Sequence, residues 1–88
     1  MKKIGIIGSG TMGNGIAQVS ASSGYVTYLL DLNKDILQKG FETIKKNLER
    51  QLIKKKIKQS NVNTIIDNIN ITTDYSHLSQ CDVIIEAA

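Results

Sequence analysis

The chain has 88 residues, of which 41% are hydrophobic, and a net charge of +3 from 11 basic and 8 acidic side chains. Its longest apolar stretches are about four residues, which excludes a membrane-spanning helix because a bilayer needs roughly 20. The single cysteine, Cys81, cannot form an internal disulfide, which fits a reducing cytoplasm. We therefore expect one small cytoplasmic domain over residues 1–88, with no secretory signal at its start.

The first third of the chain alternates between strand and helix patterns. Residues 3–7 are mostly β-branched and are followed by a glycine, which predicts a buried strand. Residues 11–23 predict a helix in which small residues recur at every fourth position, so that one face can pack closely. Residues 25–30 predict a second strand, and Asp31 stands at its carboxyl end.

Two helices and two further strands are expected after Asp31. Asn33 is a good helix cap, and apolar side chains then recur at helical spacing toward Lys56, namely Leu37, Phe41, Ile44, Leu48 and Leu52. A second, shorter helix is expected to be capped by Ser60 or Asn61, and the two should form a hairpin that leans away from the sheet. Residues 69–72 and 82–87 predict the third and fourth strands. The continuous apolar run of the fourth is typical of a strand buried on both faces.

Three glycines follow the first expected strand. Gly8, Gly10 and Gly13 have the G-x-G-x-x-G spacing that is typical of a dinucleotide-binding turn. Gly8 permits a sharp turn, Gly10 leaves the backbone amides open to a phosphate, and Gly13 lets the helix approach the strand. Unpaired N–H groups and the dipole of the helix then attract a diphosphate. Glycines also serve ordinary turns, but here the flanking strand and helix agree with the motif.

This order of elements predicts an α/β fold with a Rossmann-type parallel sheet. Right-handed crossovers give a partial sheet of order 3-2-1-4, with a protruding helical hairpin and with the early helices on one face. The link over residues 73–81 has nine residues, which leaves little room for a helix to cover the other face.

Asp31 lies 18 residues after Gly13, close to the spacing of an acid that binds the adenosine ribose. A carboxylate there can accept hydrogen bonds from both ribose hydroxyls and would repel a 2′-phosphate, by about 1–4 kcal/mol at roughly 4 Å. NAD is therefore favoured over NADP. Lys34 lies nearby and weakens this preference, and the alternative for Asp31 is a simple turn residue.

Residues 45–58 carry seven basic side chains against one acid, Glu49. These side chains form either a solvated helix face or an electropositive arm for an anionic ligand. Nucleic acid is a weaker candidate, because no aromatic residue is interleaved with the lysines.

Four segments resemble a known family. They are the run Gly8-Ser-Gly-Thr-Met-Gly-Asn-Gly-Ile-Ala-Gln18, Asp31, the pair Asp35-Ile36, and the closing run Asp82-Val-Ile-Ile-Glu-Ala-Ala88. Together they resemble the NAD-binding half of the 3-hydroxyacyl-CoA dehydrogenases, and most closely the bacterial 3-hydroxybutyryl-CoA type. The resemblance covers essentially the whole chain, including the long basic helix.

The resemblance implies hydride transfer between NAD and the 3-hydroxyl carbon of an acyl-CoA. We also expect a homo-oligomer. It places the cofactor on the glycine turn, the ribose acid and the end of the fourth strand, that is on Gly8, Gly10, Thr11, Met12, Gly13, Asp31, Ala87 and Ala88. It also implies that Asn47, Arg50 and Lys54 on the basic helix contact the CoA moiety.

The resemblance implies no catalytic residue within this chain, and we expect no metal ligand in it. The family's catalytic histidine and glutamate lie beyond the matched region, and His77 matches neither, so it is interpreted as an ordinary loop residue. Cys81 is expected to be a small core residue beside the fourth strand. The chain alone is therefore expected to be inactive, as the N-terminal part of a longer enzyme. Residues 83–85 should form an exposed apolar edge that leaves the chain marginally stable or paired with another copy.

Three other functions remain open at this point. A β-hydroxyacid or 6-phosphogluconate-type dehydrogenase would share the glycine turn but continue differently after it. A non-catalytic nucleotide-binding module would fit the short length. A methyltransferase would also combine a glycine turn with an acid at a strand end.

Overall fold

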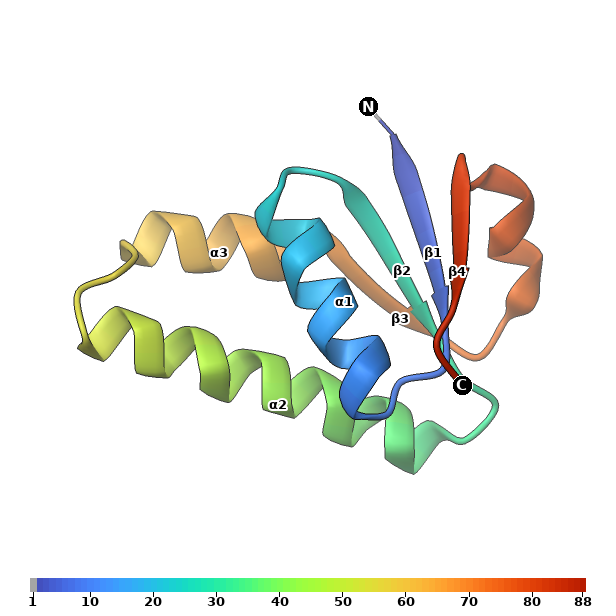
Figure 1. Cartoon of the computed structure of the whole chain (residues 1–88), viewed down its shortest axis with the longest axis horizontal. Helices are drawn as coiled ribbons and strands as arrows, with labels where there is room; N and C mark the ends of the chain where they lie inside the picture. Colours follow the sequence, from blue (N-terminus) through green and yellow to red (C-terminus); the bar gives the residue numbers. More distant parts are fainter. Residues whose placement is uncertain (1) are drawn as a thin grey trace.

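The computed structural model describes residues 2–88 (Figure 1). In chain order the elements are β1 (Lys3–Ile7), α1 (Thr11–Ser22), β2 (Val26–Leu30), α2 (Lys34–Ile53), α3 (Gln59–Asp67), β3 (Ile69–Thr72), the 3-10 helix η1 (Tyr75–Gln80) and β4 (Val83–Glu86). The predicted strands and long helices are confirmed to within a residue or a few at each end. None of the helices in residues 2–88 is long and apolar enough to cross a bilayer.

The four strands form one parallel sheet in the order β3-β2-β1-β4, which confirms the predicted topology. In the central pair, Ile4 of β1 lies opposite Thr27 of β2 and, on its other side, opposite Val83 of β4. Because every strand runs the same way, β1 and β2 both end at one edge of the sheet. The glycine turn and Asp31 follow them there.

The core lies between the sheet and the helices α1 and α2. Ile6 and Leu29 at the centre of the sheet are fully buried, as are Ile44 and Leu48 of α2. Burial of each such side chain contributes about 1.5–3 kcal/mol to folding. On α1 most of the buried residues are small, namely Gly13, Ala17, Ser20 and Ala21, so the helix backbone lies close to the strands.

The helices α2 and α3 form a hairpin that extends sideways from the sheet (Figure 1). A helix of 20 residues is about 30 Å long, and the C-terminal half of α2 therefore reaches beyond the strands. The predicted hairpin is confirmed, but the predicted cap of α3 is wrong. Lys58 is the N-cap residue, and Asn61 lies in the first turn, where its Oδ1 accepts a hydrogen bond from the Lys58 amide at 3.2 Å.

The link between β3 and β4 contains a helix, contrary to the sequence expectation. Asp74 begins η1 by accepting a hydrogen bond from the Ser76 amide at 2.9 Å. A 3-10 helix needs only three residues per turn, so two turns fit into this short link. The element lies on the face opposite α1, where the His77 ring stacks on Tyr28 with centroids 5.2 Å apart. Figure 1 shows η1 beside β4, away from the three α-helices.

The outer strand β4 is less buried than its composition suggests. Val83 and Ile84 are 43% and 51% exposed, whereas Ile85 is partly buried against the core. The expectation of a strand buried on both faces is therefore wrong for this chain, since β4 pairs only with β1. The expected apolar edge is confirmed for Val83 and Ile84.

Candidate cofactor and substrate sites

The turn after β1 is bent sharply at Gly8. Its φ is +100°, a left-handed conformation that glycine adopts without strain. Its N–H donates to the Leu30 carbonyl at 2.8 Å, which ties the turn to the end of β2. The chain then reaches Gly10, the N-cap residue of α1, in an extended conformation.

Gly13 allows α1 to approach this turn closely. A Cβ atom built on Gly13 would lie 1.6 Å from the Gly8 carbonyl oxygen, so no side chain fits there. At Gly10 the situation is the opposite, since no atom of residues 2–88 lies within 4 Å of a Cβ built there. Gly13 is therefore needed for the packing of α1, whereas Gly10 faces open space.

The N-terminus of α1 has the properties of an anion-binding site. Within the described part of the chain no side chain caps it, and its first turn contains no acid. The amides of Thr11, Met12 and Gly13 have no partner one turn earlier in the helix, and Thr11 and Met12 are exposed. Free N–H groups at the positive end of a helix dipole, beside the open space at Gly10, fit the diphosphate of a dinucleotide.

Asp31 is bound to the glycine turn. Its Oδ2 accepts hydrogen bonds from the Ser9 amide and the Ser9 hydroxyl, both at 3.0 Å, and its Oδ1 accepts one from the Asn33 amide at 3.0 Å. The Ser9 and Asn33 amides lower the pKa of Asp31, against a smaller opposing effect of burial. The side chain is partly exposed and ionised at neutral pH, and its oxygens retain lone pairs for further donors.

The end of β4 meets the same turn. The Ala87 amide donates to the Ile7 carbonyl at 2.8 Å, and a Cβ built on Gly8 would lie 2.9 Å from the Ala88 nitrogen. The structure therefore brings the expected cofactor residues, Gly8 to Gly13, Asp31, Ala87 and Ala88, to one edge of the sheet.

The expected CoA-binding residues lie together on α2, away from the glycine turn. Asn47, Arg50 and Lys54 line one pocket of about 190 Å³, together with Gln18, Gln51 and Lys56. The Asn47 side-chain amide donates to Gln18 of α1 at 3.3 Å, which fixes one wall of the pocket. No acidic side chain of residues 2–88 lines it, so it presents positive charge and amide groups.

Comparison with known proteins identifies the family. Residues 3–88 match the family described as "3-hydroxyacyl-CoA dehydrogenase, NAD binding domain". The chain belongs to this family. The predicted resemblance and the predicted cofactor, NAD, are therefore confirmed.

Individual dehydrogenases of this family are similar over the whole chain. The 3-hydroxybutyryl-CoA dehydrogenase of Bradyrhizobium diazoefficiens is 40% identical over 88 residues, and the probable 3-hydroxybutyryl-CoA dehydrogenase of Bacillus subtilis is 33% identical over 87. These matches cover 100% and 99% of this chain but 30% of each relative. The chain thus spans about 30% of the length of the curated relatives it matches.

A solved member of the family has the same fold. The crystal structure of (S)-3-hydroxybutyryl-CoA dehydrogenase from Ralstonia eutropha superimposes with a TM-score of 0.96 at 36% identity. That match covers 100% of this chain and 31% of the other. The Rossmann-type fold predicted from the sequence is therefore confirmed for this 3-hydroxyacyl-CoA dehydrogenase domain.

Three residues that shape these sites of the dehydrogenase domain were missed by sequence reasoning. Ser9 holds Asp31, Gln18 lines the Asn47 pocket, and Gly40 of α2 lies so close to the turn that a Cβ there would be 2.6 Å from the Ser9 carbonyl oxygen. Two of them had a signal in the sequence. Ser9 is a hydroxyl residue between two glycines of the motif, and Gly40 is an isolated glycine inside an amphipathic helix. The role of Gln18 had no signal besides its place in the family run.

His77 and Cys81 lie away from the glycine turn of the dehydrogenase domain. His77 lies on η1, on the other face of the sheet from α1, rather than in an irregular loop. The Cys81 thiol donates to the His77 carbonyl at 3.6 Å, and burial raises its pKa, so it behaves as a packed structural residue. Both side chains support η1 against the sheet.

Proposed function

We propose that this chain supplies the cofactor-binding half of an enzyme that transfers hydride between NAD and the 3-hydroxyl carbon of a 3-hydroxyacyl-CoA. The observation that carries the proposal is the uncapped N-terminus of α1 beside Asp31, in a chain of the 3-hydroxyacyl-CoA dehydrogenase family. When bound, NAD supplies the hydride acceptor. The residues of the chain bind and orient it.

For cofactor binding we propose that the amides of the first turn of α1 hold the diphosphate. Thr11, Met12 and Gly13 supply these amides, while Gly8 and Gly10 keep the approach free of side chains. Ala87 and Ala88 form the floor beside Gly8 and would contact the cofactor where it passes the end of β4.

For cofactor choice we propose that Asp31 selects NAD. Its ionised carboxylate can accept from both ribose hydroxyls while Ser9 holds it in place. A 2′-phosphate at this position would meet a like charge at a cost of about 1–4 kcal/mol. Lys34 begins α2 nearby and would offset part of that repulsion.

For the substrate we propose that the pocket of Asn47, Arg50 and Lys54 binds part of the CoA moiety. CoA carries several phosphate charges, and this pocket offers three cationic side chains, Arg50, Lys54 and Lys56, and amide groups. The relatives whose names include an acyl-CoA substrate support this assignment.

Proton transfer at the hydroxyl needs a general acid or base beside the cofactor. His77 is the only histidine and lies on the opposite face of the sheet from α1. We therefore expect this chain to bind NAD but not to turn over 3-hydroxybutyryl-CoA by itself.

Calorimetric titration of the chain with NADH, NADPH and S-adenosylmethionine tests the proposal. We expect NADH to bind most tightly, and Asp31→Ala to weaken NADH and narrow its advantage over NADPH. Unchanged NADH affinity in Asp31→Ala would show that Asp31 does not bind the cofactor. Preferential binding of S-adenosylmethionine would contradict the dehydrogenase assignment.

We also propose that the protein is cytoplasmic and associates with a second copy of itself. The unpaired cysteine supports the first, and the exposed Val83 and Ile84 on the open edge of β4 support the second. Sedimentation at micromolar concentration should find a dimer or a larger species. A stable monomer would contradict the self-association.

A further inference from the structure

The Ser9 hydroxyl is the only side-chain group of residues 2–88 that donates a hydrogen bond to the Asp31 carboxylate. Ser9 donates to Asp31 Oδ2 twice, from its Oγ and from its backbone amide, both at 3.0 Å. The remaining bond comes from the Asn33 amide to Oδ1 and is a local turn contact of the kind that an aspartate forms with its own backbone. The two bonds from Ser9 start 22 positions earlier in the chain and therefore tie this carboxylate to the glycine turn.

Ser9 itself has little freedom to move. Its side chain is 1% exposed, and the amide of the preceding residue, Gly8, is bonded to the Leu30 carbonyl at 2.8 Å. On the other side α2 lies so close that a Cβ on Gly40 would be 2.6 Å from the Ser9 carbonyl oxygen. Because the end of β2 and the middle of α2 both restrain Ser9, its two donors hold the carboxylate in one orientation.

The hydroxyl is the part of this arrangement that depends on the side chain, since any residue other than proline would supply the amide. Hydrogen bonds to an ionised carboxylate are stronger than those between neutral groups. Both Ser9 donors converge on Oδ2, so a rotation of the carboxylate away from the turn would break both bonds. It would also leave a buried hydroxyl without its acceptor, which is unfavourable.

The freedom of Asp31 to rotate affects the choice of cofactor. A 2′-phosphate beside a fixed carboxylate meets a like charge. A carboxylate that could turn aside would relieve this repulsion, and Lys34 at the start of α2 would then attract the phosphate. The discrimination against NADP is therefore greater when the carboxylate is held in place.

We propose that Ser9 is a positioning residue, whose hydroxyl holds the Asp31 carboxylate against the glycine turn and thereby excludes NADP. This inference rests on the proposed selection of NAD by Asp31. Ser9 does not contact the cofactor through its hydroxyl in this role, and it acts only through Asp31.

Calorimetric titration of two Ser9 variants with NADH and NADPH tests this inference. Ser9→Ala removes the hydroxyl and keeps the amide, while Ser9→Cys has a similar size but a weaker donor and provides the same comparison if the alanine variant is unstable. In both we expect NADH to weaken by less than about threefold and NADPH to bind more tightly, so that the preference for NADH falls roughly fivefold or more. A purely structural role would lower both affinities together and leave the preference unchanged.

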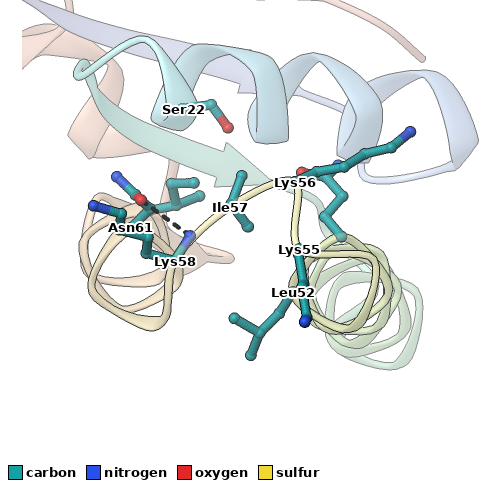
Figure 2. Close-up of a pocket in the computed structure, with 9 residues that line it drawn as sticks. Ser22, Leu52, Lys55, Lys56, Ile57, Lys58 and Asn61 are labelled. Carbon is teal, nitrogen blue, oxygen red and sulfur yellow. Dashed lines mark hydrogen bonds between the residues drawn. The ribbon is translucent and has the colours of Figure 1, made fainter.

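Two control variants remove a hydrogen bond of the fold elsewhere. Ser20→Ala removes a buried hydroxyl of α1 that is bonded to the Thr27 hydroxyl at 2.8 Å. Asn61→Ala removes the bond to the Lys58 amide at the start of α3, which Figure 2 shows as a dashed line and which lies at the far end of the α2–α3 hairpin from the glycine turn. Both should lower the midpoint of thermal unfolding without a change in the preference for NADH.

The double variant Ser9→Ala Asp31→Ala isolates the path through Asp31. Without the carboxylate the hydroxyl has nothing to hold, so the double variant should show the same preference as Asp31→Ala alone. A further change in the preference would mean that Ser9 acts by another route and would overturn the inference.

The remaining outcomes separate this inference from the proposed function. An unchanged preference in both Ser9 variants, with a reduced preference in Asp31→Ala, would reject the role of Ser9 and leave the selection of NAD by Asp31 intact. Equal losses of NADH and NADPH affinity in the Ser9 variants would reject positioning in favour of a structural role. Binding of neither cofactor to the wild-type chain would reject the proposed function together with this inference.

Discussion

The helices α1 and α2, which follow β1 and β2, begin at the same edge of the sheet, but only the N-terminus of α2 is capped by a side chain. At α2, Asn33 accepts hydrogen bonds from the amides of Asp35 and Ile36 at 2.9 and 3.0 Å, and Asp35 adds a negative charge to the first turn. At α1, Gly10 offers no side chain, and the first turn has no acid. The amides at the N-terminus of α2 therefore have an acceptor within the chain, whereas the amides and the positive dipole end of α1 are available to a ligand.

The largest loss of stability is expected from a side chain at Gly13, where α1 and the glycine turn are in close contact. Gly13→Ala would place a methyl group 1.6 Å from the Gly8 carbonyl oxygen, so the glycine turn and α1 must separate. We expect a loss of about 3 kcal/mol or more in the free energy of unfolding, measured with urea and circular dichroism.

Gly15→Ala is the matched control for this change on the same helix. No atom of the described residues lies within 4 Å of a Cβ there, so the alanine should stabilise α1 by about 0.5–1 kcal/mol. Equal effects of the two substitutions would contradict the close contact at Gly13.

A negative charge in the first turn of α1 would make its N-terminus resemble that of α2, where Asp35 lies in the first turn. Met12 is 67% exposed, so Met12→Glu should fold normally and gain about 0.3–1 kcal/mol from the helix dipole. Repulsion of the diphosphate, about 1–4 kcal/mol, should weaken NADH binding roughly tenfold or more in calorimetric titration. Met12→Gln is the control, and similar losses in both variants would show that charge is not the cause.

Removal of the Asn33 cap would leave the N-terminus of α2 uncapped, as that of α1 is. Asn33→Ala leaves the Asp35 and Ile36 amides without their acceptor and should cost about 1 kcal/mol in thermal or urea unfolding. Asp35→Asn should cost only about 0.3–1 kcal/mol, because it removes charge but no cap. The comparison between the helices would be wrong if Asn33→Ala left stability unchanged.

The smallest effect is a dependence of stability on pH that comes from Asp31. Its pKa is lowered in the folded chain by the Ser9 and Asn33 amides, so its contribution is present above the unfolded pKa and is lost as pH falls through the lower, folded pKa. Because the carboxylate is partly exposed, we expect less than about 1 kcal/mol. Urea unfolding across this acidic range should show the loss in the wild type and less of it in Asp31→Asn; identical profiles would contradict the shift.

The parts of this fold that were predictable depend on local patterns. The sheet order follows from strand patterns and right-handed crossovers, and Asn33 is a recognisable cap. The spacing of Gly8, Gly10 and Gly13 located the turn because each glycine has its own geometric reason.

The parts that were not predictable depend on tertiary neighbours. Six residues are too few for a periodic pattern, so η1 was missed. The exposure of Val83 and Ile84 is set by which strands flank β4, not by their own residue types. The bond between Ser9 and Asp31 joins residues 22 positions apart, and only the folded sheet brings them together.

The contact between Gly8 and Ala88 also sets an order of events during synthesis. The Lys3 amide bonds to the Asp82 carboxylate 79 positions later, and the end of β4 closes against the glycine turn. At roughly 5–20 residues per second, several seconds of translation separate these partners. The glycine turn is therefore synthesised early but completes its contacts late, and a nascent chain should gain full affinity for the nucleotide only after β4 has emerged and paired with β1.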